Sequence, residues 1–90
     1  MKNTGKIVSL QIYVAAYCSG CGEAQRLAGV VSGLAPEVAV EVVDISQPGA
    51  PVPPQVFATP TYILNNRVVS LGNPSLEHLC RLLGEAGVPV

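Results

Sequence analysis

The chain has 90 residues, of which 49% are hydrophobic and only 12% are charged. This length is too short for two independent cores, and the composition is not that of a disordered chain, so we expect one globular domain over residues 1–90. Five basic and six acidic residues give a net charge of −1 with no basic arm, which argues against nucleic acid or an anionic membrane as a partner.

Neither a targeting segment nor a disulfide scaffold stands out. The apolar run from Ile7 to Ala16 is interrupted by Ser9 and Gln11, whereas a signal peptide or a membrane span needs a longer uninterrupted stretch. The three cysteines include one Cys-x-x-Cys pair, whereas disulfide scaffolds use even numbers of cysteines and several bridges. We therefore expect a cytoplasmic protein in which this pair serves redox or metal chemistry.

The first half of the chain predicts a strand, a helix and a second strand. Residues 7–15 alternate between apolar and other side chains, which is typical of a strand with one apolar face. Residues 19–34 have apolar positions at helical spacing, and residues 38–45 are a valine-rich strand candidate. Together they indicate a βαβ unit with parallel strands and a right-handed crossover. The helical stripe consists of Ala24, Leu27, Ala28 and Val31.

The next segment, residues 46–58, carries four prolines. Proline lacks an N–H and clashes with the preceding helical turn, so we expect a loop with at most one helical turn near its end. Residues 61–65 predict a third strand and residues 68–71 a returning strand. Asn65-Asn66 between them is a plausible tight turn, since asparagine tolerates positive φ.

The end of the chain predicts a second main helix. Asn73 is the expected cap and Pro74 the expected first helical residue, and Gly87 ends the helix. The element order is then β-α-β-loop-β-β-α, with both helices on one face of the sheet and the proline-rich loop as a poor cover for the other. The apolar stripe of this helix consists of Leu76, Leu79, Cys80 and Leu83.

The Cys-x-x-Cys pair lies between the first strand and the first helix. Cys18 and Cys21 can both lie in the first helical turn and close a small disulfide ring around Ser19 and Gly20. Unpaired N–H groups and the helix dipole favour an anion there, so we expect the pKa of Cys18 to lie below the usual value of about 8.5. Cys18, at the exposed end, would attack a substrate disulfide, and Cys21 would resolve the mixed disulfide.

Two other interpretations use the same thiols. A zinc site needs two further ligands, and the remaining candidates, His78 and Cys80, are two residues apart on one helix and point in different directions. Carboxylates or a second subunit could complete such a site, so a metal-binding or metal-transfer module stays open, as does a non-catalytic binding module. We interpret Cys80 as a core residue and His78 as a solvent-facing one.

Residues 7–87 resemble the thioredoxin superfamily, because they combine the Cys18–Cys21 pair with the segment Ala58-Thr59-Pro60-Thr61. Three anchors carry the resemblance in order: residues 17–21, residues 59–64, and Leu71-Gly72 before the last helix. It implies an α/β fold with a four-stranded mixed sheet, two main helices on one face and a shortened second helix. It also implies a cis bond at Thr59-Pro60 facing the dithiol, which leaves the Thr59 main chain free to pair with an extended substrate segment.

The resemblance also assigns a role to residues near the dithiol and has limits. It implies that Gly72 lets a substrate chain approach, and that Tyr17 is part of an apolar docking rim or a half-buried aromatic residue. Thioredoxins have Gly-Pro where this chain has Ser19-Gly20, and a buried acid where its first strand is apolar. Glutaredoxins usually have an acidic residue after the glycine that corresponds to Gly72. Here Gly72 is followed by Asn73-Pro74, so glutathione binding stays open.

We therefore predict a thiol–disulfide oxidoreductase that reduces or exchanges protein disulfides through a mixed disulfide. Its expected partners are a disulfide-containing protein substrate and a reductase or small-thiol electron donor. No metal and no cofactor beyond the redox-active Cys18–Cys21 pair is expected. The predicted site comprises the catalytic Cys18 and Cys21, the active-site turn Ser19 and Gly20, and the substrate-binding residues Tyr17, Thr59, Pro60 and Gly72.

Overall fold

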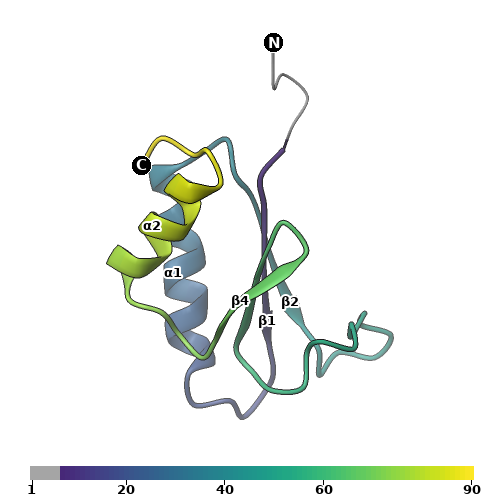
Figure 1. The fold of residues 1–90 in the computed structure, drawn as a ribbon. Coiled ribbons are helices and arrows are strands. Elements are labelled where there is room, and N and C mark those ends of the chain that lie inside the picture. The colour runs from purple at the N-terminus through teal and green to yellow at the C-terminus, as the bar shows by residue number, and fades with distance from the viewer. Residues whose placement is uncertain (1–6) are drawn as a thin grey trace.

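The computed structural model describes residues 7–90, and its secondary structure closely follows the sequence patterns (Figure 1). Every strand and the first helix begin and end within two residues of the predicted bounds. In chain order the elements are β1 (Ser9–Val14), α1 (Cys21–Leu34), β2 (Ala39–Asp44), β3 (Thr61–Leu64), β4 (Arg67–Leu71) and α2 (Leu76–Glu85).

The strands form one mixed sheet in the order β2-β1-β3-β4. β1 runs parallel to β2 and antiparallel to β3, so that Leu10 lies opposite Val40 on one side and Leu64 on the other. Asn65 and Asn66 have φ of 51° and 68° and turn the chain from β3 into the antiparallel β4, as the sequence predicts. The strand that leads into the Cys-x-x-Cys pair is therefore an inner strand of the sheet, held by backbone hydrogen bonds on both edges.

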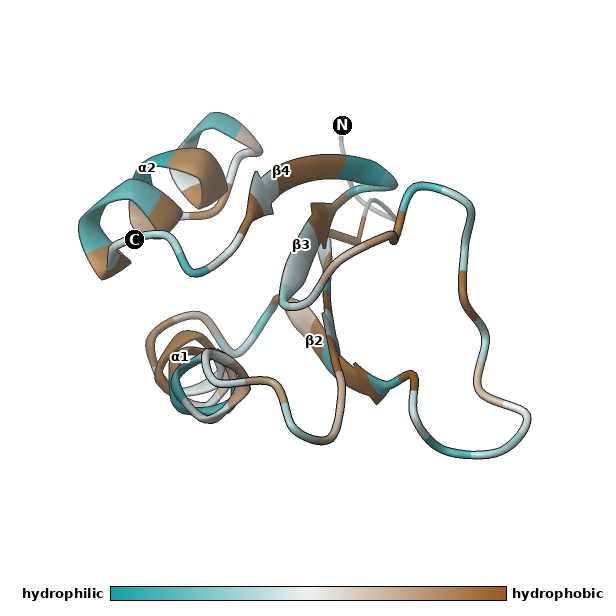
Figure 2. Ribbon diagram, turned by 90° about the horizontal axis from the view of Figure 1, so that it is seen from below, coloured by the Kyte–Doolittle hydropathy of each residue, from teal (hydrophilic) through white to brown (hydrophobic). Residues whose placement is uncertain are grey.

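Both helices lie on one side of the sheet, as expected (Figure 2). The main core fills the space between the sheet and the two helices, because alternate residues of β1 point toward the helices. Removing these side chains from water is the main favourable term in folding. The whole predicted stripe of α1 is buried there, together with Leu10, Ile12, Val14, Tyr62, Leu64, Leu79 and Leu83.

The other face of the sheet is covered in part by the segment between β2 and β3 (Figure 2). Val56 of this segment is buried against Tyr13, Val43 and Ile63, so the loop covers this face better than its composition suggests. The shortened helix expected here is absent from residues 45–60, which contain turns only. Five prolines in this stretch remove N–H groups that a helix would need.

The start of α2 differs from the prediction. The helix begins at Leu76 and not at Pro74, and its cap is Ser75, whose hydroxyl accepts a hydrogen bond of 3.0 Å from the His78 backbone N–H. Serine is as good a cap as asparagine, so the local sequence allows either start. The side chain of Asn73 is thereby left free for a contact elsewhere in the fold.

The C-terminus and the beginning of β1 lie at the end of the sheet away from the turn that joins β1 to α1 (Figure 1). Within residues 7–90, neither helix combines the length and the apolar character needed to cross a bilayer. The β1–α1 turn, which carries both cysteines of the pair, lies at the opposite end of the sheet (Figure 1).

Candidate active site

Hydrogen bonds to Ser46 and Asp44, at the end of β2, hold the start of the turn between β1 and α1. The Ala16 backbone N–H donates to the Ser46 hydroxyl over 3.2 Å, and Asp44 accepts from both the hydroxyl and the backbone N–H of Ser46. These hydrogen bonds, the one from the Ser46 hydroxyl above all, hold the pKa of Asp44 below its usual value. The end of β2 thus fixes the chain just before Tyr17, which has a φ of 62°.

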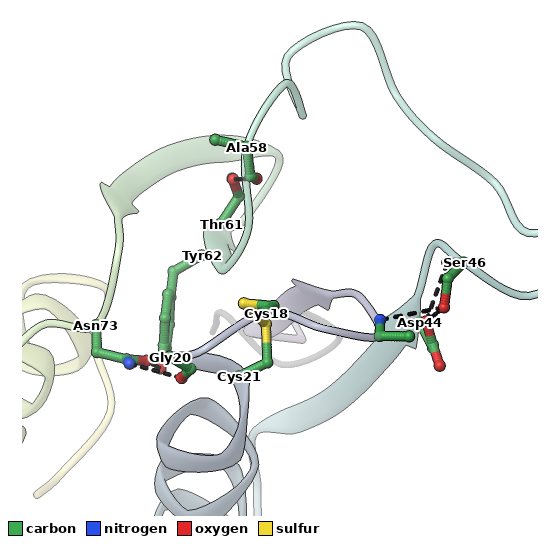
Figure 3. Close-up of a disulfide and its surroundings, with 10 residues drawn as sticks. Cys18, Gly20, Cys21, Asp44, Ser46, Ala58, Thr61, Tyr62 and Asn73 are labelled. Atoms are coloured by element: carbon green, nitrogen blue, oxygen red, sulfur yellow. Dashed lines mark hydrogen bonds between the residues drawn. A yellow bond between two sulfur atoms is a disulfide. The ribbon is translucent and has the colours of Figure 1, made fainter.

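Cys18 and Cys21 form a disulfide, with their Cα atoms 5.4 Å apart (Figure 3). α1 begins at Cys21, and the Cys21 backbone N–H donates to the Cys18 carbonyl over 3.2 Å. Cys18 is half-buried, whereas only 4% of Cys21 is exposed and it packs in the main core. The two cysteines therefore differ in exposure: Cys18 keeps some access to solvent, whereas Cys21 is shielded.

Pro60 lies against this turn. A Cβ built on Gly20 would lie 3.5 Å from the Pro60 Cδ, so the proline ring faces Gly20, one of the two residues between the cysteines. The Thr59–Pro60 peptide bond is cis. The Gly72 backbone N–H donates to the Pro60 carbonyl over 2.8 Å, which joins the third anchor to the second. The structure thus links Gly20 to Pro60 and Pro60 to Gly72, although these residues lie far apart in the sequence.

A hydrogen-bonded chain that the sequence does not reveal also reaches the turn (Figure 3). The Tyr62 hydroxyl donates to the Asn73 side-chain oxygen over 2.7 Å, and the Asn73 amide nitrogen donates to the Gly20 carbonyl over 2.8 Å. Tyr62 is fully buried, and burial raises its pKa to about 12, with the charge of Glu23 adding to the rise. The hydroxyl therefore stays protonated at neutral pH and can donate.

The remaining predicted residues lie at the rim of the site. Tyr17 is fully exposed, so its interpretation as a half-buried aromatic residue is wrong, and its interpretation as part of a docking rim stays a prediction. Thr59 is half-buried and Ser19 is exposed. Each anchor also contains or closely follows an exposed apolar residue: Tyr17 and Leu71 begin the first and third anchors, and Phe57 lies two residues before the second.

The structure offers few metal ligands near the pair. Among residues 7–90, no three His, Cys, Asp or Glu side chains gather in a way that could hold a metal ion. Cys80 is a free, half-buried thiol on α2, and His78 is exposed on the same helix. The interpretation of His78 as solvent-facing agrees with this, and Cys80 is less buried than the neighbouring Leu79 and Leu83.

Comparison with solved structures shows which fold this is. Thioredoxin O2 from Arabidopsis thaliana, in its oxidized state, superposes with a TM-score of 0.67 over 90% of this chain and 76% of that chain, at 20% sequence identity. No protein-family model matches the sequence, and no curated protein matches it. The chain therefore has the thioredoxin-like α/β fold that the sequence predicts, and its Cys-x-x-Cys pair at disulfide distance supports a redox role.

Proposed function

We propose that this protein is a thiol–disulfide oxidoreductase whose reactive pair is Cys18 and Cys21. The observation that carries the proposal is the unequal burial of the two disulfide-bonded cysteines at the start of α1, in a turn that Pro60 contacts. Unpaired N–H groups at a helix N-terminus favour the thiolate, which is the nucleophile in disulfide exchange. The half-exposed Cys18 is accordingly the attacking residue, and the buried Cys21 is the resolving one.

The exchange proceeds in two displacements. The Cys18 thiolate of the reduced protein attacks a substrate disulfide; a Cys18–substrate bond forms, the substrate S–S bond breaks, and the leaving sulfur takes up a proton. Cys21 then loses its proton, attacks the Cys18 sulfur and releases the second substrate sulfur as a thiolate. Two electrons pass to the substrate, the proton that Cys21 loses balances the one that the first leaving sulfur takes up, and the reverse sequence oxidises a dithiol. The core around Cys21 is apolar, so its proton must pass to water or to a group outside that core.

The substrate we propose is an exposed disulfide in an extended protein segment. Such a segment can pair with the Thr59 main chain and pass over Gly72, which has no side chain to obstruct it. Three exposed apolar residues in or near the anchors, Tyr17, Phe57 and Leu71, could provide contact area for such a segment. Regeneration requires a reductase or a small-thiol donor. The dithiol itself supplies the redox chemistry without a further cofactor, and the cytoplasmic location stays a prediction.

Cysteine variants test this function. With dithiothreitol as the reductant, the wild-type protein should accelerate reduction of the insulin disulfides, and Cys18→Ser should abolish the acceleration. Cys21→Ser should accumulate a covalent adduct with the substrate through Cys18, because the resolving thiol is missing. Cys80→Ser is the matched control and should retain full turnover, since this third cysteine lies on α2 outside the pair.

The contrary results are equally definite. Turnover that survives in Cys18→Ser, or the absence of turnover by the wild-type protein with every thiol donor tried, would contradict the proposal. A stoichiometric metal in protein purified without chelators, with both thiols resistant to alkylation, would favour a metal-binding module instead. Unchanged activity in cells of a variant without the two cysteines would favour a non-catalytic binding module.

A further inference from the structure

The side chain of Asn73 joins the dithiol turn to a fully buried tyrosine. It bridges 53 positions of sequence to reach Gly20 and 11 positions to reach Tyr62. The Gly20 carbonyl can only accept a hydrogen bond, so the amide nitrogen of Asn73 must face it and the amide oxygen must face Tyr62. The Tyr62 hydroxyl must then donate. The orientation of the carboxamide is therefore fixed by its partners on both sides.

The contact lies on the peptide unit that leads into the resolving cysteine. Because a trans peptide is planar, a donor that holds the Gly20 carbonyl on one side also fixes where the Cys21 N–H points on the other. In the disulfide form this N–H lies 3.2 Å, nitrogen to oxygen, from the Cys18 carbonyl. It thus donates to the backbone carbonyl of Cys18, the residue whose sulfur becomes the thiolate on reduction.

We propose that Asn73 is a positioning residue that favours the thiolate form of Cys18 by holding and polarising the Gly20–Cys21 peptide, with Tyr62 as its buried anchor. The proposal rests on the thiol–disulfide function proposed above. A donor on the carbonyl strengthens the N–H of the same peptide unit as a donor, because linked hydrogen bonds polarise one another. The strengthened N–H stabilises a neighbouring thiolate, and so stabilises the reduced protein relative to the disulfide.

The absence of a side chain at Gly20 belongs to the same arrangement. A Cβ at this position would lie 3.1 Å from the Asn73 amide nitrogen, closer than ordinary van der Waals contact. A larger residue would therefore push the carboxamide away from the carbonyl it contacts. Glycine between the two cysteines and asparagine after Gly72 are accordingly matched to each other.

Two variants separate this role from a structural one. Asn73→Ala removes both hydrogen bonds, and Tyr62→Phe removes only the anchoring hydroxyl and keeps the buried ring. Gln25→Ala, which shortens an exposed amide on α1, is the matched control. The readouts are the Cys18 pKa, from the pH dependence of thiolate absorbance, and the Cys18–Cys21 reduction potential, from equilibration with a glutathione buffer.

Asn73→Ala should reduce the ionisation constant of Cys18 about threefold, on the scale expected when a charge-assisted hydrogen bond loses a polarising partner. The same factor lowers the reduction potential by about 14 mV, at 29.6 mV per tenfold. Tyr62→Phe should shift both readouts in the same direction by less. The double variant should match Asn73→Ala, since Tyr62 acts only through Asn73. Gln25→Ala should change neither.

The outcomes distinguish this inference from the proposed function. If the wild-type protein turns over substrate but Asn73→Ala and Tyr62→Phe leave the Cys18 pKa and the potential unchanged, the positioning role is wrong and the redox function stands. Lower thermal stability without a change in either readout would show a purely structural contact and would likewise overturn the inference. If the wild-type protein shows no turnover, the proposed function fails first.

Discussion

The same substitution at two open glycines should change stability in opposite directions. Gly29 lies on the exposed face of α1, and Gly72 follows β4 with a φ of +90°. Within the described chain, a Cβ at either position would meet no heavy atom within 4 Å beyond the adjoining backbone. Neither substitution gains or loses packing, so the change in unfolding free energy reports backbone conformation alone.

The expected magnitudes follow from the two conformations. Gly29→Ala should raise the free energy of unfolding by about 1 kcal/mol, because alanine is the better helix former by that amount. Gly72→Ala should lower it by about 1–2 kcal/mol, because a Cβ at positive φ clashes with the adjacent backbone. Gly72→Asn should have a smaller effect than Gly72→Ala, since asparagine tolerates positive φ better.

Thermal unfolding of the disulfide-bonded proteins, followed by circular dichroism, measures the difference. One kcal/mol corresponds to a shift of about 4–8 °C in the midpoint for a domain of this size, so the two alanine variants should differ by at least about 8 °C. Gly29→Ala should unfold above the wild-type midpoint and Gly72→Ala below it. A Gly72→Ala midpoint at or above that of the wild type would refute the assignment of strain to positive φ at this residue.

Two further changes test burial in the site and on the far face of the sheet. Burial raises the pKa of Tyr62 to about 12, whereas the value in an unfolded chain is about 10. The protonated hydroxyl therefore contributes fully to stability below about pH 10, and this contribution is lost as the pH rises from about 10 to about 12. In urea unfolding over this pH range, the free energy of unfolding should fall less steeply for Tyr62→Phe than for the wild type, and parallel profiles would contradict this. Val56→Ala should lower the free energy of unfolding by about 1–2 kcal/mol through two lost methyl groups, whereas the half-exposed Val52→Ala should lower it by less than about 0.5 kcal/mol; equal losses would show that the loop does not pack on the sheet.

The elements with a local signal are the ones that the sequence predicts correctly. The stripe of α1 repeats at helical spacing and is buried in full, and the alternation in β1 places Leu10, Ile12 and Val14 in the main core. The Asn65-Asn66 turn follows from the tolerance of asparagine for positive φ. Each of these patterns depends on residues close in sequence, so one chain suffices to recognise it.

The contacts that the sequence does not reveal depend on the tertiary fold. Asn73 has the residue type and position of a helix cap, yet Ser75 takes that role and the Asn73 side chain contacts Gly20. No local pattern distinguishes these two uses of one asparagine. The hydrogen bond from the Ala16 backbone N–H to the Ser46 hydroxyl likewise joins two loops that are distant in sequence. Such contacts depend on the strand order of the sheet, which brings loops that are distant in sequence to the same end of the strands.

The proline-rich segment shows the same limit for packing. Its composition predicts an irregular chain correctly, but composition alone does not show that Val56 is buried against Tyr13 and Ile63. A single valine at the right place contributes apolar contact without any regular secondary structure. Burial on this face is therefore a property of where the segment crosses the sheet, which its own residues do not encode locally.

The placement of the C-terminus at the end of the sheet away from the disulfide has a practical consequence (Figure 1). A fluorophore, an electrode surface or a bead attached through Val90 would be separated from the reactive sulfurs by the length of the fold. An immobilised layer of this protein would then present its dithiols outward, which suits electrochemical or single-molecule force measurements of disulfide exchange.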